Sequence, residues 1–214
     1  MKNNFGLYLV ITNPVAGYED CTKAAVENRV LYIQLRMKNA MREEVVQVGK
    51  KLRAITDESE TKLIINDDVI AARMIDADGV HLGQTDINII EARKLWITNK
   101  PKIFGLSTHN ETQAQAAQDL PLDYIGIGPV FTTPTKQIPD PVVGINRVAA
   151  IIKQSKLPCV AIGGIDAQRL PKILSADVNN FAVVRYVCAS NEPSLRIKEL
   201  MNIWQYSQHT KNAS

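Results

Sequence analysis

The chain has 214 residues, of which 45% are hydrophobic and 22% charged, a balance typical of soluble globular domains rather than of disordered or fibrous chains. Its formal net charge of +3 is spread along the sequence without a basic block, which argues against general attraction to nucleic acid or to a membrane surface. No apolar stretch approaches the roughly 20 residues that a bilayer-spanning helix needs, so we expect a single domain with one core.

The two ends and the cysteines indicate the compartment. Met1 to Asn4 leads straight into a strand-like run without a signal peptide. Cys21, Cys159 and Cys188 are odd in number and lack the spacing of metal ligands, so a reducing cytoplasm is the expected location. The polar residues 207–214 are predicted to form a disordered tail after a domain over residues 1–206.

Short runs rich in β-branched and aromatic residues alternate with helix-like stretches along almost the whole chain. Most of these runs are apolar on both faces, which is typical of strands buried in a parallel sheet. The expected strands are Leu7 to Thr12, Val30 to Met37, Lys62 to Asn66, Gly79 to Gly83, Lys102 to Ser107, Tyr124 to Phe131, Cys159 to Gly163 and Phe181 to Val187. The expected helices are Glu19 to Asn28, Met41 to Thr56, Val69 to Ile75, Ile87 to Trp96, Glu111 to Leu120, Asn146 to Gln154, Ala167 to Ala176 and Glu192 to Tyr206.

Eight strands, each followed by a helix, predict a single (β/α)8 barrel rather than an open doubly wound sheet. Capping residues such as Asn110 and Asp166 stand immediately before expected helices and support the count. In such barrels the loops after the strands form the active face. Several expected strands end in polar residues, and the sixth is followed by Thr132 to Lys136, whose hydroxyls and ammonium suit an anionic ligand. One shared site is therefore expected at this end of the barrel.

The second strand ends in a pair of cations. Arg36 and Lys38 are alternate residues, so they can point to the same side and clamp a phosphate, although a solvated salt-bridge pair fits the same pattern. Gln34 has the same parity in an otherwise apolar strand. A buried amide is costly without a ligand or a polar network, which favours the clamp.

Carboxylates follow the third and fourth strands. Asn66-Asp67-Asp68 could cap the next helix or bind a cation, and Asp86 follows the neighbouring strand. Acidic side chains from two adjacent strand ends suit a hard cation that bridges to phosphate oxygens, and Mg²⁺ is the natural candidate. His81 is expected to be a hydrogen-bonded barrel histidine rather than a metal ligand.

A glycine pair closes the seventh strand. Gly163-Gly164 precedes a helix and would let backbone N–H groups approach an anion, although a glycine pair is also a common tight turn. Its place after the seventh strand matches the usual phosphate site of such barrels.

The ordered set of these motifs resembles the thiamine-phosphate synthase family, from about Leu7 into the helix that begins near Glu192. The motifs are Gln34 to Lys38, Asn66-Asp67, Gly79 to Gln84 with Asp86, Ser107, Gly128 to Phe131 with Thr133 to Lys136, and Ala161 to Ile165.

The resemblance implies a transferase that joins an aminopyrimidine pyrophosphate to a thiazole phosphate in a Mg²⁺-assisted reaction. It implies that the pyrophosphate is held by Gln34, Arg36, Lys38, Asn66, Ser107 and Lys136, and that Arg36, Lys38 and Lys136 are catalytic. It implies that Asp67 and Asp86 hold the metal and that Thr133, Thr135, Gly164, Val184 and Arg185 receive the thiazole phosphate. Arg185-Tyr186 stands where the family usually has a small pair, so the details of thiazole binding depart from its pattern here.

Two alternatives remain beside this interpretation. A thiazole tautomerase of the same barrel type would need neither metal nor pyrophosphate, and Asp67, Asp86 and Lys136 argue against it. A non-catalytic sensor of thiamine precursors would fit a site in which Arg185 has drifted. Gln137 to Val143, with two prolines, is a candidate lid by its location alone.

Overall fold

Eight short parallel strands close into a barrel in the computed structural model, which describes residues 4–133 and 141–212. Consecutive strands pair with one another, and β1 pairs with β8 to close the ring. The strands are β1 (Leu7–Ile11), β2 (Tyr32–Leu35), β3 (Lys62–Asn66), β4 (Gly79–Leu82), β5 (Ile103–Thr108), β6 (Tyr124–Ile127), β7 (Cys159–Ile162) and β8 (Phe181–Val183).

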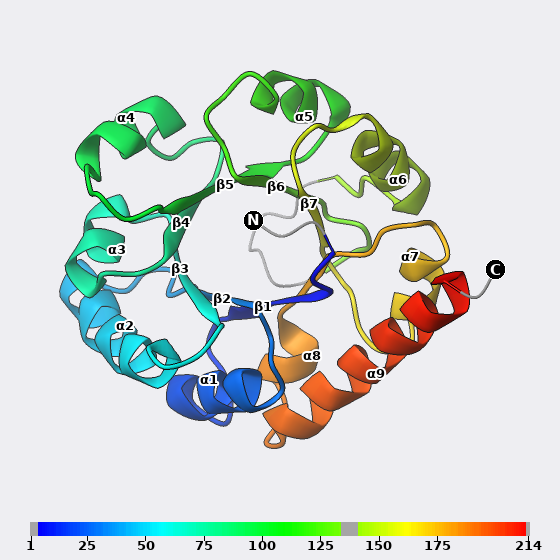
Figure 1. Ribbon diagram of the computed structural model, residues 1–214, viewed down its shortest axis with the longest axis horizontal. Coiled ribbons are helices and arrows are strands. Elements are labelled where there is room, and N and C mark those ends of the chain that lie inside the picture. The colour runs from blue at the N-terminus through cyan, green and yellow to red at the C-terminus, as the bar shows by residue number, and fades with distance from the viewer. Residues whose placement is uncertain (1–3, 134–140, 213–214) are drawn as a thin grey trace.

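Helices surround the barrel as an outer ring, seen from along the barrel axis in Figure 1. They are α1 (Tyr18–Glu27), α2 (Arg42–Thr56), α3 (Val69–Ile75), α4 (Ile89–Leu95), α5 (Glu111–Ala117), α6 (Ile145–Gln154), α7 (Leu170–Leu174), α8 (Arg185–Cys188) and α9 (Pro193–Asn212). The alternation confirms the predicted (β/α)8 barrel. Within the described ranges no helix is long and apolar enough to cross a bilayer.

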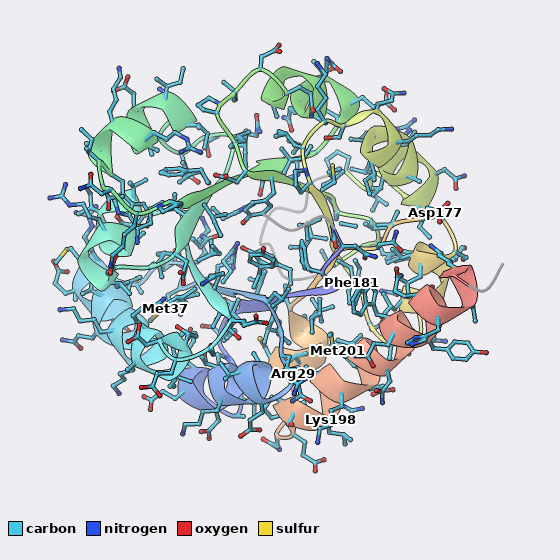
Figure 2. The ribbon with its side chains drawn as sticks, in the orientation of Figure 1. Arg29, Met37, Asp177, Phe181, Lys198 and Met201 are labelled. Atoms are coloured by element: carbon cyan, nitrogen blue, oxygen red, sulfur yellow. The ribbon has the colours of Figure 1, made fainter. Side chains whose placement is uncertain are left out.

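The strand pleat divides the buried side chains between two cores. Along β1, Leu7 and Leu9 belong to the large core between strands and helices, whereas Tyr8 and Val10 point into the barrel. Figure 2 shows the outer arrangement, with Phe181 in the barrel wall and Lys198 on the solvent side of α9. Apolar residues on both faces of the strands are thus explained by burial on both faces.

Helix starts follow the predicted capping chemistry at α5. The Asn110 side chain accepts a hydrogen bond from the Gln113 backbone N–H at 2.9 Å. The Asp166 side chain likewise accepts a hydrogen bond from the Arg169 backbone N–H at 2.8 Å. Arg169 is the residue just before α7, which begins at Leu170. These caps satisfy backbone donors that a helix leaves unpaired in its first turn.

The last strand is shorter than the sequence predicts. Residues 181–187 were expected to be one strand, but β8 ends at Val183, and Val184 turns the chain into α8. Val187 and Cys188 donate their backbone N–H groups to the Val184 carbonyl, at 3.2 and 2.9 Å. Both side chains are buried in this helical turn as they would be in a strand, so apolar character alone does not separate the two structures.

The C-terminal segment also differs from the prediction. Residues 207–212, expected to be part of a disordered tail, continue α9 to Asn212. Lys211 Nζ donates to the Leu174 carbonyl at 2.8 Å and pairs with Asp177 at 2.7 Å, and Gln208 bonds to the Asn179 side chain at 3.1 Å. The polar composition that suggested disorder supplies contacts to the loop after α7.

Candidate active site

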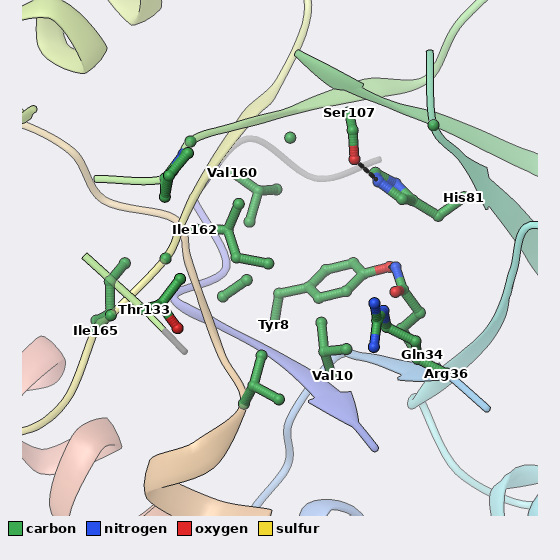
Figure 3. A pocket seen from close by; sticks show the side chains of 18 of the residues that line it. Tyr8, Val10, Gln34, Arg36, His81, Ser107, Thr133, Val160, Ile162 and Ile165 are labelled. Atoms are coloured by element: carbon green, nitrogen blue, oxygen red, sulfur yellow. Dashed lines mark hydrogen bonds between the residues drawn. The ribbon is translucent and has the colours of Figure 1, made fainter. Parts of the chain in front are cut away.

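A cavity of about 750 Å³ opens at the carboxyl ends of the strands, and all eight strands contribute lining residues. The structure brings most of the residues singled out in the sequence into this cavity, and Figure 3 shows Gln34, Arg36 and Ser107 among them. They are Gln34, Arg36, Lys38, Asn66, Asp67, Asp86, Ser107, Thr133, Gly164, Val184 and Arg185. Thr135, Lys136 and residues 137–140 of the candidate lid lie outside the described residues.

A chain of polar side chains forms the floor of the cavity. Gln34 Nε2 donates to Tyr8 Oη at 3.0 Å, and Tyr8 Oη lies 2.8 Å from Tyr124 Oη. His81 Nδ1 is 2.9 Å from Tyr124 Oη, and His81 Nε2 is 2.8 Å from Ser107 Oγ. The prediction that His81 is a hydrogen-bonded barrel histidine is confirmed.

Burial controls the ionisation of the two floor tyrosines. Tyr8 and Tyr124 are 2% and 1% exposed, and removal from water raises the pKa of each phenol far above its usual value. Both hydroxyls therefore keep their protons at any pH at which the protein works.

Two cations leave β2 on the cavity side. The Arg36 guanidinium is half-buried, and burial lowers its pKa while the charge of Asp67 opposes that shift. Among the described residues the Arg36 guanidinium has no hydrogen bond or ion-pair partner, whereas Lys38 Nζ donates to Asp67 Oδ2. A partly desolvated guanidinium without a partner is costly unless an anion binds to it.

The carboxylates divide their roles between capping and the cavity. Asp68 caps α3, because its Oδ1 accepts from Ala71 N at 2.9 Å. Asp67 therefore is not needed as a cap, and it faces the cavity together with Asp86. Asp86 Oδ2 accepts from Gly83 N at 2.7 Å, and burial followed by the adjacent Asp67 carboxylate raises the pKa of Asp86.

The Asp67 and Asp86 carboxylates lie close together, and Lys38 pairs with only one of them, Asp67. Oxygen donors in this arrangement fit a hard divalent cation. Among the described residues no cluster of three or more His, Cys, Asp or Glu side chains that could hold a metal ion is present.

The opposite side of the cavity is built from the loop after β7. Gly164 has φ of +65°, and a Cβ there would lie 2.8 Å from the Thr132 carbonyl, so a side chain is excluded. Arg169 Nη1 donates to the Gly164 carbonyl at 2.7 Å and its guanidinium lies over the Phe131 ring. The loop is thereby held close to the Thr132 and Thr133 segment.

Arg185 lies beside this loop, at the first residue of α8 rather than at the end of a strand. Arg185 is exposed, and its guanidinium has no hydrogen bond or ion pair with the described residues. Tyr186 is bonded to Glu199 and to Arg196 on α9. Of the unusual pair, the arginine is thus available to the cavity and the tyrosine joins α8 to α9.

Sequence reasoning missed several lining residues. They are Tyr8, Tyr124, His109 and Arg169. The tyrosines sit in apolar strands and Arg169 in a stretch expected to be helical, so neither stood out. Their parity relative to Val10 and Gly126, which also line the cavity, is the signal that could have found the tyrosines.

Comparisons with known proteins show which family the chain resembles. The family model described as thiamine monophosphate synthase matches residues 7–187. Thiamine-phosphate synthase from Vibrio campbellii is 36% identical over 94% of this chain and 98% of its own, and that from Syntrophomonas wolfei is 32% identical over 96% and 99%. The structure of thiamine phosphate pyrophosphorylase from Pyrococcus furiosus superposes with a TM-score of 0.86 at 30% identity, covering 96% of this chain and 98% of that one.

Proposed function

Because the chain belongs to the thiamine monophosphate synthase family and is a transferase of thiamine biosynthesis, we propose that its cavity joins an aminopyrimidine pyrophosphate to a thiazole phosphate. The observation that supports this proposal is that one cavity is lined by two separate groups of residues whose chemistry suits anions. One follows β2 and β3 around Arg36, and the other follows β7 around Gly164, on the far side of the barrel. The cavity between them accommodates two small substrates.

The pyrophosphate half of the first substrate binds on the β2, β3 and β5 side. The guanidinium of Arg36 supplies paired donors, and Lys38 adds a mobile ammonium. The set of binding residues is Gln34, Arg36, Lys38, Asn66, Ser107 and Lys136, the last of which lies outside the described residues.

Asp67 and Asp86 would hold Mg²⁺, which when bound would neutralise charge that develops on the departing pyrophosphate. Lys38, now paired with Asp67, would turn toward the pyrophosphate once that carboxylate has another cation to bind. Arg36, Lys38 and Lys136 stabilise the same developing charge and are the catalytic residues of the proposal.

The thiazole phosphate binds at the opposite wall. Backbone N–H groups at Gly164 and at Val184, which precedes α8, approach the phosphate, and the hydroxyls of Thr133 and Thr135 donate to it. Thr135 lies outside the described residues. Arg185 adds a guanidinium where the family usually has a small residue.

The bond between the pyrimidine's methylene carbon and the pyrophosphate oxygen breaks with both electrons leaving on oxygen. The thiazole nitrogen then donates its lone pair to that carbon, so no protein nucleophile takes part.

The three cysteines are buried, free and absent from the cavity lining in the described chain. Buried free cysteines are typical of proteins in a reducing compartment, and we propose that the protein works in the cytoplasm.

Neither a thiazole tautomerase nor a non-catalytic sensor is favoured by the relatives, and neither would need the Asp67 and Asp86 pair to bind a metal.

The test is to incubate the purified protein with both precursors, with and without Mg²⁺, and to measure released pyrophosphate. Release should require both precursors and the metal. A rate that is unchanged in excess chelator would contradict the metal's role, and no release under any condition would contradict the transferase assignment.

A further inference from the structure

The floor of the cavity contains five polar side chains in one unbroken hydrogen-bonded series. We call it the floor chain: Gln34, Tyr8, Tyr124, His81 and Ser107, in that order. Its members come from β2, β1, β6, β4 and β5, so it crosses the inside of the barrel. Figure 3 shows Gln34 beside the Tyr8 hydroxyl and His81 bonded to Ser107.

The direction of each hydrogen bond follows from where the hydrogens can go. Tyr8 Oη accepts from Gln34, and its other contact is Tyr124 Oη at 2.8 Å. Because Tyr8 is 2% exposed, its own hydrogen would be buried without an acceptor unless it points to Tyr124. Tyr8 therefore donates to Tyr124.

The same reasoning applies to the next two bonds. Tyr124 Oη receives the Tyr8 hydrogen, and its own hydrogen has His81 Nδ1 as acceptor, at 2.9 Å. A histidine that accepts at Nδ1 is neutral and carries its proton on Nε2. His81 Nε2 then donates to Ser107 Oγ at 2.8 Å, which leaves the serine hydrogen free to point into the cavity.

The two ends of the floor chain consequently have opposite character. Gln34 is 4% exposed and uses Nε2 within the chain, so it presents Oε1, an acceptor, to the cavity. Ser107 presents a donor. An exocyclic amine needs the first and a pyrophosphate oxygen needs the second, and both groups belong to one substrate under the proposed function.

We propose that Tyr8, Tyr124 and His81 are positioning residues that fix the polarity of the floor chain, so that Gln34 accepts from the pyrimidine amine while Ser107 donates to the pyrophosphate. This inference rests on the proposed function for the identity of the substrate. The hydrogen-bond direction rests on the ligand-free protein alone. Raised pKa values of the tyrosines support it, since both phenols stay protonated donors.

The first test is ¹⁵N NMR of the histidine rings in the ligand-free protein. The chain has three histidines, so His81 is assigned by the loss of its signal in His81→Gln. In the wild type His81 should be neutral with its proton on Nε2. Tyr124→Phe removes the donor to Nδ1 and should produce a mixture of the two tautomers. A protonated Nδ1 in the wild type overturns the inference.

The second test measures binding of the aminopyrimidine pyrophosphate against an analogue with an oxo group in place of the amine. Tyr8→Phe removes the acceptor that lies 3.0 Å from Gln34 Nε2 and leaves only the Tyr124 hydroxyl to hold the amide, so the amide can turn more easily and present a donor instead. The preference for the amine should fall roughly tenfold, about the effect of one hydrogen bond. Tyr32→Phe is the matched control, because Tyr32 is a buried barrel tyrosine that stacks on Tyr8 but is not in the cavity lining.

A preference unchanged in Tyr8→Phe, or lowered as much in Tyr32→Phe, overturns the positioning role. These readouts need no turnover, so they separate the two claims. A wild-type protein that binds the pyrimidine with the expected preference but releases no pyrophosphate contradicts the proposed reaction and leaves the floor chain supported.

Discussion

Two neighbouring aspartates after β3 have different roles in the structure. Asp67 and Asp68 are adjacent in sequence, yet one faces the cavity and the other caps α3. Asp67 reaches the cavity from a left-handed backbone conformation, with φ of +64°. The sequence predicted the acidic cluster but left the capping and metal roles open, because both need the same residue types at the same strand end.

The first prediction separates these two carboxylates. Asp86→Ala should lower turnover by roughly 10²- to 10³-fold, as expected for losing one preorganised charge-stabilising interaction, and should raise the Mg²⁺ concentration needed. Asp68→Ala should instead cost about 1 kcal/mol of stability, the usual effect of losing a helix cap, and keep the Mg²⁺ requirement. Turnover at a series of Mg²⁺ concentrations and thermal melts of both variants check this. Equal Mg²⁺ requirements in the two variants would remove Asp86 from the metal site.

The second prediction concerns the residue that departs from the family pattern. Arg185→Ser should weaken binding of thiazole phosphate by about 1.5 to 3 kcal/mol, the range for a hydrogen bond to a charged group. Binding of the pyrimidine pyrophosphate should stay the same, since its proposed clamp lies across the barrel. Titration calorimetry with each precursor measures both.

Arg196→Ser provides the control for Arg185. Arg196 stacks on Tyr186 from α9 and does not line the cavity in the described chain. Its loss should leave both affinities as they are. Equal weakening in the two arginine variants would mean that Arg185 acts through the packing of α8 rather than on phosphate.

The strands and helices show which parts of the fold can be predicted from sequence. Apolar runs at regular spacing predicted the barrel because burial on both faces demands such runs. The end of β8 was predicted wrongly, because Val187 and Cys188 are buried in α8 just as they would be in a strand. The floor chain could not be predicted from the sequence, for a different reason. Tyr8 and Tyr124 are 116 residues apart in the sequence, and their hydroxyls meet only in the folded barrel. Nothing in either strand sequence indicates that contact.

The third prediction tests how β5 and β6 fit together. A Cβ at Gly105 would lie 2.2 Å from Tyr124 Cζ, so Gly105→Ala forces the tyrosine ring to move. We expect a loss of about 1 to 3 kcal/mol in the free energy of unfolding, the usual cost of overpacking. Gly126→Ala is the control, because its nearest contact would be His81 Cε1 at 3.4 Å, an ordinary distance. Urea unfolding of both variants checks the order, and an equal loss in the two would contradict it.

At the scale of the whole molecule, α9 fastens the end of the chain to the barrel. It contacts α1 and α7, and its last turns bond to the loop after α7 through Gln208 and Lys211. The sequence suggested a free tail here because residues 207–214 are polar. Their partners lie about 30 residues away in the chain, on Leu174, Asp177 and Asn179, and only the folded structure shows that they meet.

The fourth prediction follows from this attachment. Removing residues 207–214 should cost about 1 to 2 kcal/mol and lower Tm by roughly 2 to 8 °C, with kinetics unchanged because the helix lies away from the cavity. Lys211→Met should reproduce part of the shift, since it removes the bond to Leu174 and the pair with Asp177. Calorimetry measures Tm. A truncated protein with the same Tm as the full chain would mean that residues 207–214 do not stabilise the fold.

The packing of Trp204 on Gly6, just before β1, decides what tryptophan fluorescence can report in solution. A Cβ at Gly6 would lie 2.7 Å from the Trp204 ring, so the indole of α9 packs directly on the backbone before β1, and its buried Nε1 has no hydrogen-bond partner among the described residues. Trp96 packs edge-on against Phe104. These are the chain's two tryptophans, and neither lines the cavity in the described residues. Intrinsic fluorescence should therefore follow the detachment of the outer helices on unfolding, while substrate binding needs a different optical probe.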